Sequence, residues 1–360
     1  MMPPRTGDPR AAEPAFAAKG AQTESVIAGI DLGGTKMAVC LASESRVIAR
    51  HRAAVPKSGA ESAVTEAMIA LVSDSCMSLG IEPASLAAIG VSACGPFEGA
   101  RGQLASAAPN LCGGLTADSV LPNRWMRIPL EAPLRDRFRT ADIVIANDAQ
   151  SALLAEHRFG ALRGASHGAY LTWSTGIGVG LMLDNRLVRG KAGNAGHAGH
   201  SMVAASGSHR PRCGCGNDGD VESLAGGAAL AHAWGNDTVA LFEAFRRGDH
   251  RASGLVESAL DAVSDLLYNL FVTLDLERIA IGGGLFCGQS DLLLPALRRR
   301  LFESGRYPGM QGMLAGTRVV AVSDPSRTAE MGALCLVLPQ DWQPHWSDKF
   351  SANHDSVIAA

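Results

Sequence analysis

One sequence pattern occurs twice in this chain and constrains its fold more than any other feature. Residues 26–43 read as an apolar strand, a turn of small residues and a second apolar strand, and residues 168–183 repeat this order. About 140 residues separate the two units, and alternating strand and helix patterns follow each of them. Such alternation predicts an α/β architecture. We therefore expect two α/β domains of related topology that face one cleft.

The segments around these units set the domain boundaries that we predict. In chain order they are a disordered N-terminal tail (1–24), a small domain (25–146), a large domain (147–324), a helix that packs back on the small domain (about 325–337) and a C-terminal tail (338–360). Within the large domain, 197–222 is an irregular loop rich in His and Cys. Helices are predicted after it at about 221–234, 236–247 and 253–274.

Composition excludes several classes of protein. The chain has 360 residues, of which 47% are hydrophobic and 19% are charged. Disordered chains have fewer hydrophobic residues and more charge, so the sequence is not that of a disordered protein. Its net charge of −3 argues against nucleic acid or an anionic membrane as the main partner. We find neither an apolar run of membrane-spanning length nor a signal peptide. Eight cysteines, six of them scattered singly, fit a reducing cytoplasm.

The turn of the first unit carries candidate phosphate ligands. Its sequence runs Asp31-Leu32-Gly33-Gly34-Thr35-Lys36. Glycines let the backbone turn sharply and point N–H groups at an anion, Thr35 adds a hydroxyl, and an acid at a strand end could hold Mg²⁺ through water. A simple hairpin turn is the alternative, because Gly-Gly pairs are common there. The spacing of a Walker P-loop is absent.

Three further segments offer related chemistry. Ser174-Thr175-Gly176 repeats the donors of the first turn, and Gly282-Gly283-Gly284 follows a strand, which suits a ligand that approaches bare backbone. Asn147-Asp148 ends a buried strand and opens a helix. Asp is a preferred N-cap, and it is also a suitable general base at the carboxyl end of a strand, where α/β clefts open. The dipeptide alone leaves both readings open.

A cluster of His and Cys residues predicts a metal site. His197 and His200 precede Cys213 and Cys215, and Asp220 follows them. One His, two Cys and one Asp supply four ligands of the types that tetrahedral Zn²⁺ accepts. The alternative is a loop that folds without metal and packs its Cys side chains as small apolar groups.

Together and in this order, the motifs resemble those of the ROK family of repressors, uncharacterised open reading frames and sugar kinases. They are IDLGGTK, PNL at 109–111, NDAQSALLAE, STGIGVGL, AGHAGH, CGCGxxGxxE and IAIGGGL, and they cover about residues 26–337. The resemblance implies the two-domain fold of the actin, hexokinase and heat-shock ATPase superfamily, hinged around a central nucleotide and sugar cleft. It also implies a glucokinase-like, ATP-dependent hexose kinase that phosphorylates the 6-hydroxyl of its sugar.

The resemblance further implies a role for each candidate residue. Asp148 would be catalytic and would accept the proton of the attacking hydroxyl. ATP and Mg²⁺ would be bound by Asp31, Gly33, Gly34, Thr35, Lys36, Thr175, Gly176, Gly283 and Gly284. The sugar would be bound by Asn110, Asn147, Asp148, His197, His200 and Glu222. A structural Zn²⁺ would be held by His200, Cys213, Cys215 and Asp220, with His209 as a spare candidate.

Two residues depart from the family's pattern. His197 stands where the ExGH motif has a sugar-binding Glu, and the HxGH variant is similar to that of some N-acetylmannosamine kinases. Asp220 stands at the place of the third zinc Cys, and an Asp oxygen makes a harder and weaker site. We therefore keep an N-acetylmannosamine (N-acylhexosamine) kinase as the alternative function, and a non-catalytic sugar-sensing ROK protein as another.

The expected partners follow from the same reasoning. Repressors of the family carry a winged helix–turn–helix ahead of the kinase-like part, whereas only 24 residues without a helical pattern precede the first strand here. We expect a small-molecule sugar and a second copy of the chain in a homodimer, and neither nucleic acid nor membrane. The motifs leave open which sugar is bound and whether ATP or polyphosphate is the donor.

Overall fold

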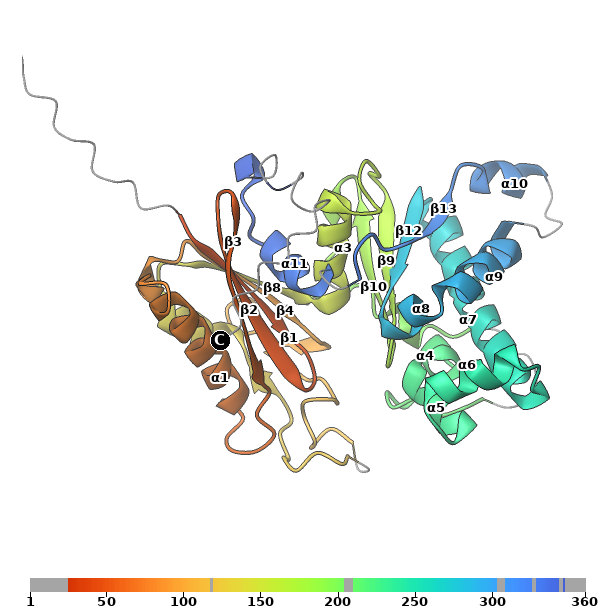
Figure 1. Ribbon diagram of the computed structural model, residues 1–360, viewed down its shortest axis with the longest axis horizontal. Coiled ribbons are helices and arrows are strands. Elements are labelled where there is room, and N and C mark those ends of the chain that lie inside the picture. The colour runs from red at the N-terminus through yellow and green to blue at the C-terminus, as the bar shows by residue number, and fades with distance from the viewer. Residues whose placement is uncertain are drawn as a thin grey trace, which may run out of the picture.

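Two separate five-stranded sheets form the framework of the computed structural model (Figure 1). The described residues are 25–116, 119–203, 210–302, 308–325, 328–342 and 346. The predicted N-terminal tail, most of the C-terminal tail and His209 lie outside them. The predicted α/β class is confirmed, because strands and helices alternate along most of the chain.

The first sheet has the strand order β3-β2-β1-β4-β8. Its strands are β1 (Ile27–Leu32), β2 (Lys36–Ser43), β3 (Arg46–Ala54), β4 (Ala88–Ala93) and β8 (Asp142–Asn147). β1 pairs antiparallel with β2, whereas β1, β4 and β8 are parallel, with Leu32 opposite Ala93 and Ala93 opposite Asn147. The carboxyl ends of the three parallel strands therefore lie at one edge of the sheet.

The second sheet has the order β11-β10-β9-β12-β13 and repeats this arrangement. Its strands are β9 (Gly168–Trp173), β10 (Ile177–Leu183), β11 (Arg186–Leu187), β12 (Arg278–Gly282) and β13 (Arg318–Ala321). β9 and β10 form the antiparallel hairpin, and β9, β12 and β13 are parallel. The turn after β9 and the glycines after β12 therefore lie at one edge of this sheet.

Helices cover the two sheets and lie between them (Figure 1). They are α1 (Ala63–Met77), α2 (Glu131–Arg137), α3 (Asp148–Phe159), α4 (Val221–Ala225), α5 (Gly227–Trp234), α6 (Thr238–Arg246), α7 (His250–Leu274), α8 (Gly284–Gly288), α9 (Ser290–Phe302), α10 (Pro308–Leu314) and α11 (Thr328–Cys335). A small third sheet joins β5 (Phe97–Glu98), β6 (Ala105–Ser106) and β7 (Ile128–Pro129). Within the described residues, no helix has the length and apolar character needed to cross a membrane.

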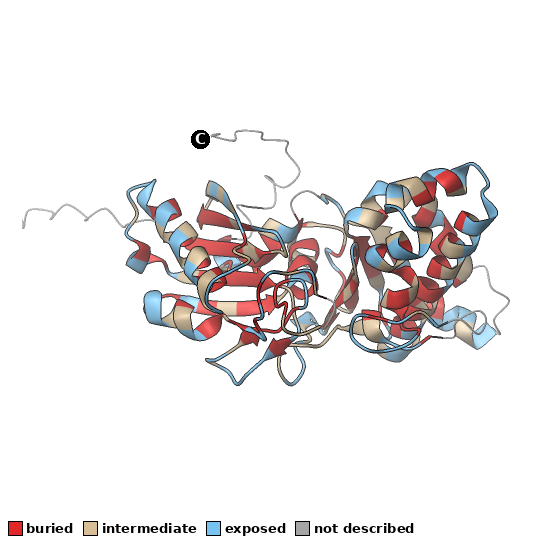
Figure 2. Cartoon of the chain, turned by 90° about the horizontal axis from the view of Figure 1, so that it is seen from below, coloured by how far each residue is buried: buried red, intermediate tan, exposed pale blue. Residues whose placement is uncertain are grey.

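Each large sheet has its own apolar core, and Figure 2 shows that the strands of both are mostly buried. Trp173 and Phe271 belong to the core of the second sheet, and Met68 and Phe138 to that of the first. Because burial of apolar side chains is the main favourable term in folding, each core stabilises its own sheet. The strand ends that carry candidate site residues are thus built on rigid supports.

Helix α11 returns to the first sheet after the chain has built the second. A Cβ atom at Gly90 would lie 2.0 Å from the carbonyl oxygen of Ala333, and one at Gly29 would lie 2.8 Å from the nitrogen of Leu334. Only glycine permits so close an approach between helix and strands. The expected contact of the last helix with the first sheet agrees with this packing, whereas the domain boundaries stay a prediction.

Candidate functional site

The first glycine turn connects β1 to β2 and places Asp31 near Asp148. Burial, together with the nearby Asp148 carboxylate, raises the pKa of the Asp31 carboxyl to about 6. The N–H of Gly33 donates to the carbonyl of Lys36 (3.1 Å) and closes the turn, while Thr35 is exposed. The arrangement puts an acid and a turn of small residues at the end of a parallel strand.

Asp148 is the first residue of α3, and the structure separates its two possible roles. Asn147 is the N-cap residue, and its side-chain oxygen accepts the N–H of Ala149 (3.0 Å). Asp148 Oδ1 accepts the same N–H (2.8 Å), which leaves Oδ2 without a protein donor among the described contacts. Asp148 is exposed, so a substrate can reach its carboxylate. The surrounding protein nevertheless shields this carboxylate from part of the water, and this desolvation raises its pKa. Asp148 therefore has the properties of a general base.

The second turn, Ser174–Gly176, is held by the helices that follow the metal-ligand loop. The N–H groups of Gly227 and Ala228 donate to the carbonyls of Ser174 (2.8 Å) and Thr175 (2.9 Å). A Cβ atom at Gly176 would lie 2.4 Å from Glu222 Oε2, so a larger residue here would displace the Glu222 carboxylate. The first two N–H groups of α5 thus hold the backbone of the second turn in place.

The glycines after β12 lie beside this second turn. Gly283 has φ +92°, and a Cβ atom there would lie 2.5 Å from the carbonyl oxygen of Trp173. A Cβ atom at Gly284 would lie 3.6 Å from Ser174 Oγ. Gly283 and Gly284 therefore lie against Trp173 and Ser174, the two residues directly before Thr175 and Gly176.

Asn110 and His197 lie on the side of the first sheet. A Cβ atom at Gly34 would lie 3.0 Å from Asn110 Nδ2, and one at Gly95, just after β4, would lie 3.2 Å from His197 Nε2. His197 Nε2 is buried and has no hydrogen-bond partner among the described residues. Burial lowers the pKa of His197, and the neighbouring His200 lowers it further. His197 is therefore neutral at physiological pH.

The loop that carries His197 is hydrogen-bonded to β5 of the small third sheet and to α3. The Asn194 side chain exchanges two hydrogen bonds with the backbone of Phe97, of 2.7 and 2.8 Å. Gln150 of α3, which is fully buried, donates to the carbonyls of Gly193 (3.0 Å) and Ala195 (2.9 Å). These bonds hold the loop against the start of α3, which follows β8, and His197 itself lies beside Gly95, just after β4.

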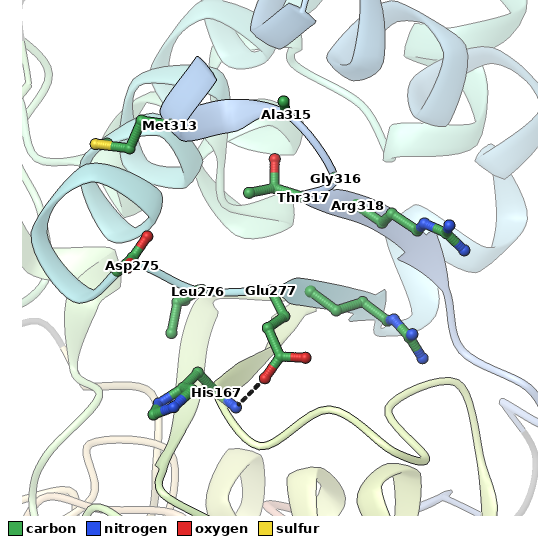
Figure 3. Close-up of a pocket in the computed structure, with 10 residues that line it drawn as sticks. His167, Asp275, Leu276, Glu277, Met313, Ala315, Gly316, Thr317 and Arg318 are labelled. Carbon is green, nitrogen blue, oxygen red and sulfur yellow. Dashed lines mark hydrogen bonds between the residues drawn. The ribbon is translucent and has the colours of Figure 1, made fainter. Parts of the chain in front are cut away.

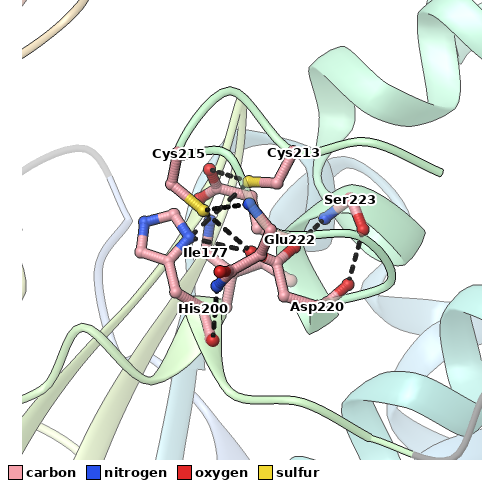
Figure 4. A network of polar contacts seen from close by, with 8 residues as sticks. Ile177, His200, Cys213, Cys215, Asp220, Glu222 and Ser223 are labelled. Carbon is pink, nitrogen blue, oxygen red and sulfur yellow. Dashed lines mark hydrogen bonds and ion pairs between the residues drawn. The ribbon is translucent and has the colours of Figure 1, made fainter. Parts of the chain in front are cut away.

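The four predicted zinc ligands lie together (Figure 4). One ligand atom from each of His200, Cys213, Cys215 and Asp220 lies within 4.8 Å of the others. His200 Nδ1 is 3.1 Å and Cys215 Sγ is 3.3 Å from Asp220 Oδ2. Asp220 is fully buried, and although burial raises its pKa, hydrogen bonds from Ser223 and from the cluster lower it overall.

Asp220 connects this cluster to the second turn. While its Oδ2 faces the cluster, its Oδ1 accepts the N–H of Ser223 (2.8 Å) and caps α4. Glu222, in the first turn of α4, accepts the N–H of Ile177 at Oε2 (2.8 Å). A chain of contacts therefore runs from the metal-ligand cluster through α4 to the residue after Gly176 (Figure 4).

Two positions differ from a simple reading of the motifs. Lys36 is exposed at the start of β2, opposite Ala54, and its side chain has no hydrogen bond to another predicted site residue in the described part of the chain. Lys57 was not singled out by any motif, yet its Nζ donates to the carbonyls of Gly34 and Asn110. A lone Lys in a loop carries no spacing signal that could have identified it.

A hollow of about 510 Å³ lies away from these residues (Figure 3). Its lining includes His167, Glu277, Arg278 and Arg318. β12 starts at Arg278 and ends at Gly282, so the hollow is at the opposite edge of the second sheet from the glycines. Glu277 Oε1 accepts the backbone N–H of His167 (2.9 Å), which is a structural bond. The hollow is not part of the candidate site.

Comparison with known proteins places the chain in a family. The ROK family model matches residues 27–339. The chain is 30% identical over 277 residues to an N-acetylmannosamine kinase of Haemophilus influenzae (strain PittGG), covering 76% of this chain and 84% of that protein.

Solved structures agree with this result. The crystal structure of ROK hexokinase from Thermus thermophilus has 30% identity and a TM-score of 0.66, covering 86% of this chain and 97% of that one. A ROK family glucokinase from Streptomyces griseus, in complex with glucose and AMPPNP, has 25% identity and a TM-score of 0.63, with 86% and 98% covered. The predicted two-domain actin/hexokinase-like fold is thereby confirmed, and the chain belongs to the ROK family.

Proposed function

We propose that this protein is an ATP-dependent hexose kinase that transfers the γ-phosphoryl group to the 6-hydroxyl of a sugar, in the manner of glucokinase. The similarity to a ROK hexokinase, a glucokinase and an N-acetylmannosamine kinase supports a sugar kinase. The observation that carries the proposal is the place of Asp148, an accessible carboxyl with a raised pKa beside Asp31 at the end of β8.

The geometry supports phosphoryl transfer with Asp148 as the base. Phosphoryl transfer depends mainly on positioning and on charge neutralisation, so one oriented carboxylate and donors for the phosphates suffice. Asp148 Oδ2 would accept the proton of the sugar hydroxyl, and the raised pKa makes this carboxylate a better base. Asn147 keeps its side-chain NH₂ for a sugar oxygen, because only its oxygen is used as the N-cap.

Two turns are proposed to hold the nucleotide and its metal ion. Asp31 fits Mg²⁺, because an ionised carboxylate is a ligand that this ion prefers, and a cation would offset the charge of a carboxylate that lies half-buried near Asp148. Bound Mg²⁺ neutralises charge on the phosphate oxygens. The residues proposed for the nucleotide are Gly33, Gly34, Thr35, Lys36, Thr175, Gly176, Gly283 and Gly284.

We propose a structural Zn²⁺ at His200, Cys213, Cys215 and Asp220. The donor set fits, since three ligand types that zinc accepts supply four atoms within 4.8 Å of one another. Zinc there would fix the segment that carries His200 and, through Asp220, the helix that carries Glu222. About one zinc per chain is expected by metal analysis of the purified protein.

The test of the proposed function is an ADP-release assay with Mg-ATP on glucose, mannose, fructose, N-acetylglucosamine and N-acetylmannosamine. Turnover on one sugar establishes the kinase and names its substrate. A parallel series with polyphosphate, read by the sugar phosphate formed, decides the donor. Absence of turnover with either donor on all sugars contradicts the proposal and favours a sugar-sensing protein.

The second candidate is an N-acylhexosamine kinase, which His197 favours. The curated relative above is named N-acetylmannosamine kinase, and a neutral, half-buried imidazole stands at the place of the carboxylate of the family's ExGH motif. We expect His197→Glu to shift the preference toward glucose by about tenfold in the ratio of kcat/KM values, because a carboxylate accepts hydrogen bonds from hydroxyls at the C1 and C2 end. An unchanged sugar profile would show that His197 does not set specificity.

The pH profile provides a further prediction. Asp31 and Asp148 must be ionised, and both have raised pKa values in the free protein, that of Asp31 about 6. We expect kcat/KM to fall as the pH drops below about 6, by about tenfold per pH unit for each group that titrates. The measurement is kcat/KM from pH 4.5 to 8 at constant free Mg²⁺. A flat profile down to pH 4.5 would contradict the raised pKa values.

A further inference from the structure

Lys57 lies in the loop after β3, and its half-buried side chain contacts two candidate-ligand segments. Nζ donates to the carbonyl oxygen of Gly34 in the first turn and to that of Asn110 (3.4 Å). These residues are far apart in the chain, and Gly34 also faces the Asn110 side chain. In the described part of the chain, no other cationic side chain donates to either segment.

The backbone of Lys57 is itself fixed, which separates it from an ordinary surface lysine. Asn123 is 5% exposed, and its Nδ2 donates to the carbonyls of Lys57 (3.2 Å) and Leu111 (3.1 Å). Its Oδ1 accepts the N–H of Gly113 (2.8 Å). The loop of Lys57 and the loop of Asn110 are therefore joined twice, by the Asn123 amide and by the Lys57 ammonium group.

The contact between Lys57 and the Gly34 carbonyl sets the direction of the backbone N–H groups in the first turn. A trans peptide is planar, so the carbonyl of Gly34 and the N–H of Thr35 point in opposite directions. When Lys57 holds this carbonyl, the Thr35 N–H faces away from Lys57. The next carbonyl, of Thr35, accepts the N–H of Val55 (3.0 Å). The orientations of successive peptides in a glycine turn, which is intrinsically flexible, are thereby set before a phosphate arrives.

We propose that Lys57 is a positioning residue for phosphoryl transfer, which orients the first phosphate turn and links it to the segment that carries Asn110. This inference rests on the proposed function, because it takes the turn as a phosphate site and Asn110 as a sugar ligand. It has two consequences. Loss of the ammonium group weakens nucleotide binding, and it weakens the coupling between sugar binding and nucleotide binding, since the two segments no longer share a donor.

The test is calorimetric titration of Mg-AMPPNP into the wild type, Lys57→Met and Lys57→Arg, each with and without the sugar that gives the highest turnover. We expect Lys57→Met to raise the Kd for AMPPNP about tenfold, the size of a lost hydrogen bond from a charged donor. The sugar should strengthen AMPPNP binding less in this variant than in the wild type. Lys57→Arg should retain most of the affinity, because a guanidinium can donate to both carbonyls. Arg299→Met, an exposed cation of α9, is the matched control.

Three outcomes would overturn the inference. A Kd for Lys57→Met within twofold of the wild type shows that the turn is set without Lys57. A loss of affinity that Lys57→Arg does not rescue, with a matching fall in the melting temperature, shows a role in folding only. If the wild type itself binds no AMPPNP, the proposed nucleotide site is wrong, and this inference is wrong with it. That result differs from the first outcome, in which the wild type binds AMPPNP and Lys57→Met binds it equally well.

Discussion

Replacing Asp148 with Asn is expected to lower kcat by about a thousandfold, since general base catalysis contributes two to four orders of magnitude. The Asn side chain has nearly the same shape, and its amide oxygen can still accept the Ala149 N–H that Asp148 Oδ1 accepts at 2.8 Å. It cannot take up a proton. We therefore expect the Kd of the sugar to change by no more than a few fold. Steady-state kinetics and calorimetric sugar titration measure the two quantities.

Asp142→Asn is the matched control for this experiment. Asp142 is an exposed acid at the other end of the same strand, β8, and its replacement should leave kcat unchanged. If Asp148→Asn turns over at more than a tenth of the wild-type rate, Asp148 is not the base. If sugar binding is lost together with turnover, Asp148 serves mainly as a sugar ligand.

Disruption of the proposed zinc site is expected to have the second largest effect. Cys213→Ser, or removal of zinc by a chelator, should abolish stoichiometric zinc and lower the melting temperature by on the order of 10 °C. It should also lower kcat/KM by about a hundredfold. The physical reason is the chain of contacts from Asp220 through the α4 cap to Glu222, which holds the N–H after Gly176. Zinc content, melting temperature and kcat/KM with respect to both substrates are the measurements.

Asp220→Cys separates the two roles proposed for this residue, which are to bind zinc and to cap α4. A thiolate should bind zinc more tightly than a carboxylate oxygen, as competition with a chelator would measure. The same change removes the N-cap of α4, which should cost about 1 kcal/mol of stability. Cys76→Ala in α1, away from the cluster, is the control. Purified wild type without zinc, or Cys213→Ser with unchanged melting temperature and activity, would show that the loop folds without metal.

Individual strands could be predicted from the sequence because the apolar patterns that mark them extend over only a few neighbouring residues. The apolar runs VIAGID and KMAVCLAS correspond to β1 (Ile27–Leu32) and β2 (Lys36–Ser43). The four candidate metal ligands could be proposed from the sequence because they lie within about 20 residues of one another, and the structure brings them together. The single helix predicted at 221–234 was wrong in one respect, because it is two helices, α4 and α5, that meet at Gly226. The break lets the start of α5 bind the second turn.

The sequence by itself determined the repeated strand–turn–strand units, the α/β class and the candidate residues in each motif, because periodicity and glycine turns act over a few neighbours. The tertiary structure alone decided which residue of Asn147-Asp148 caps α3, and so left an oxygen of Asp148 free of the cap. It also brought Lys57 to Gly34 and Asn110. These outcomes depend on contacts between segments distant in sequence, which form only when the sheet and its loops have packed, and no pattern of neighbouring residues encodes them.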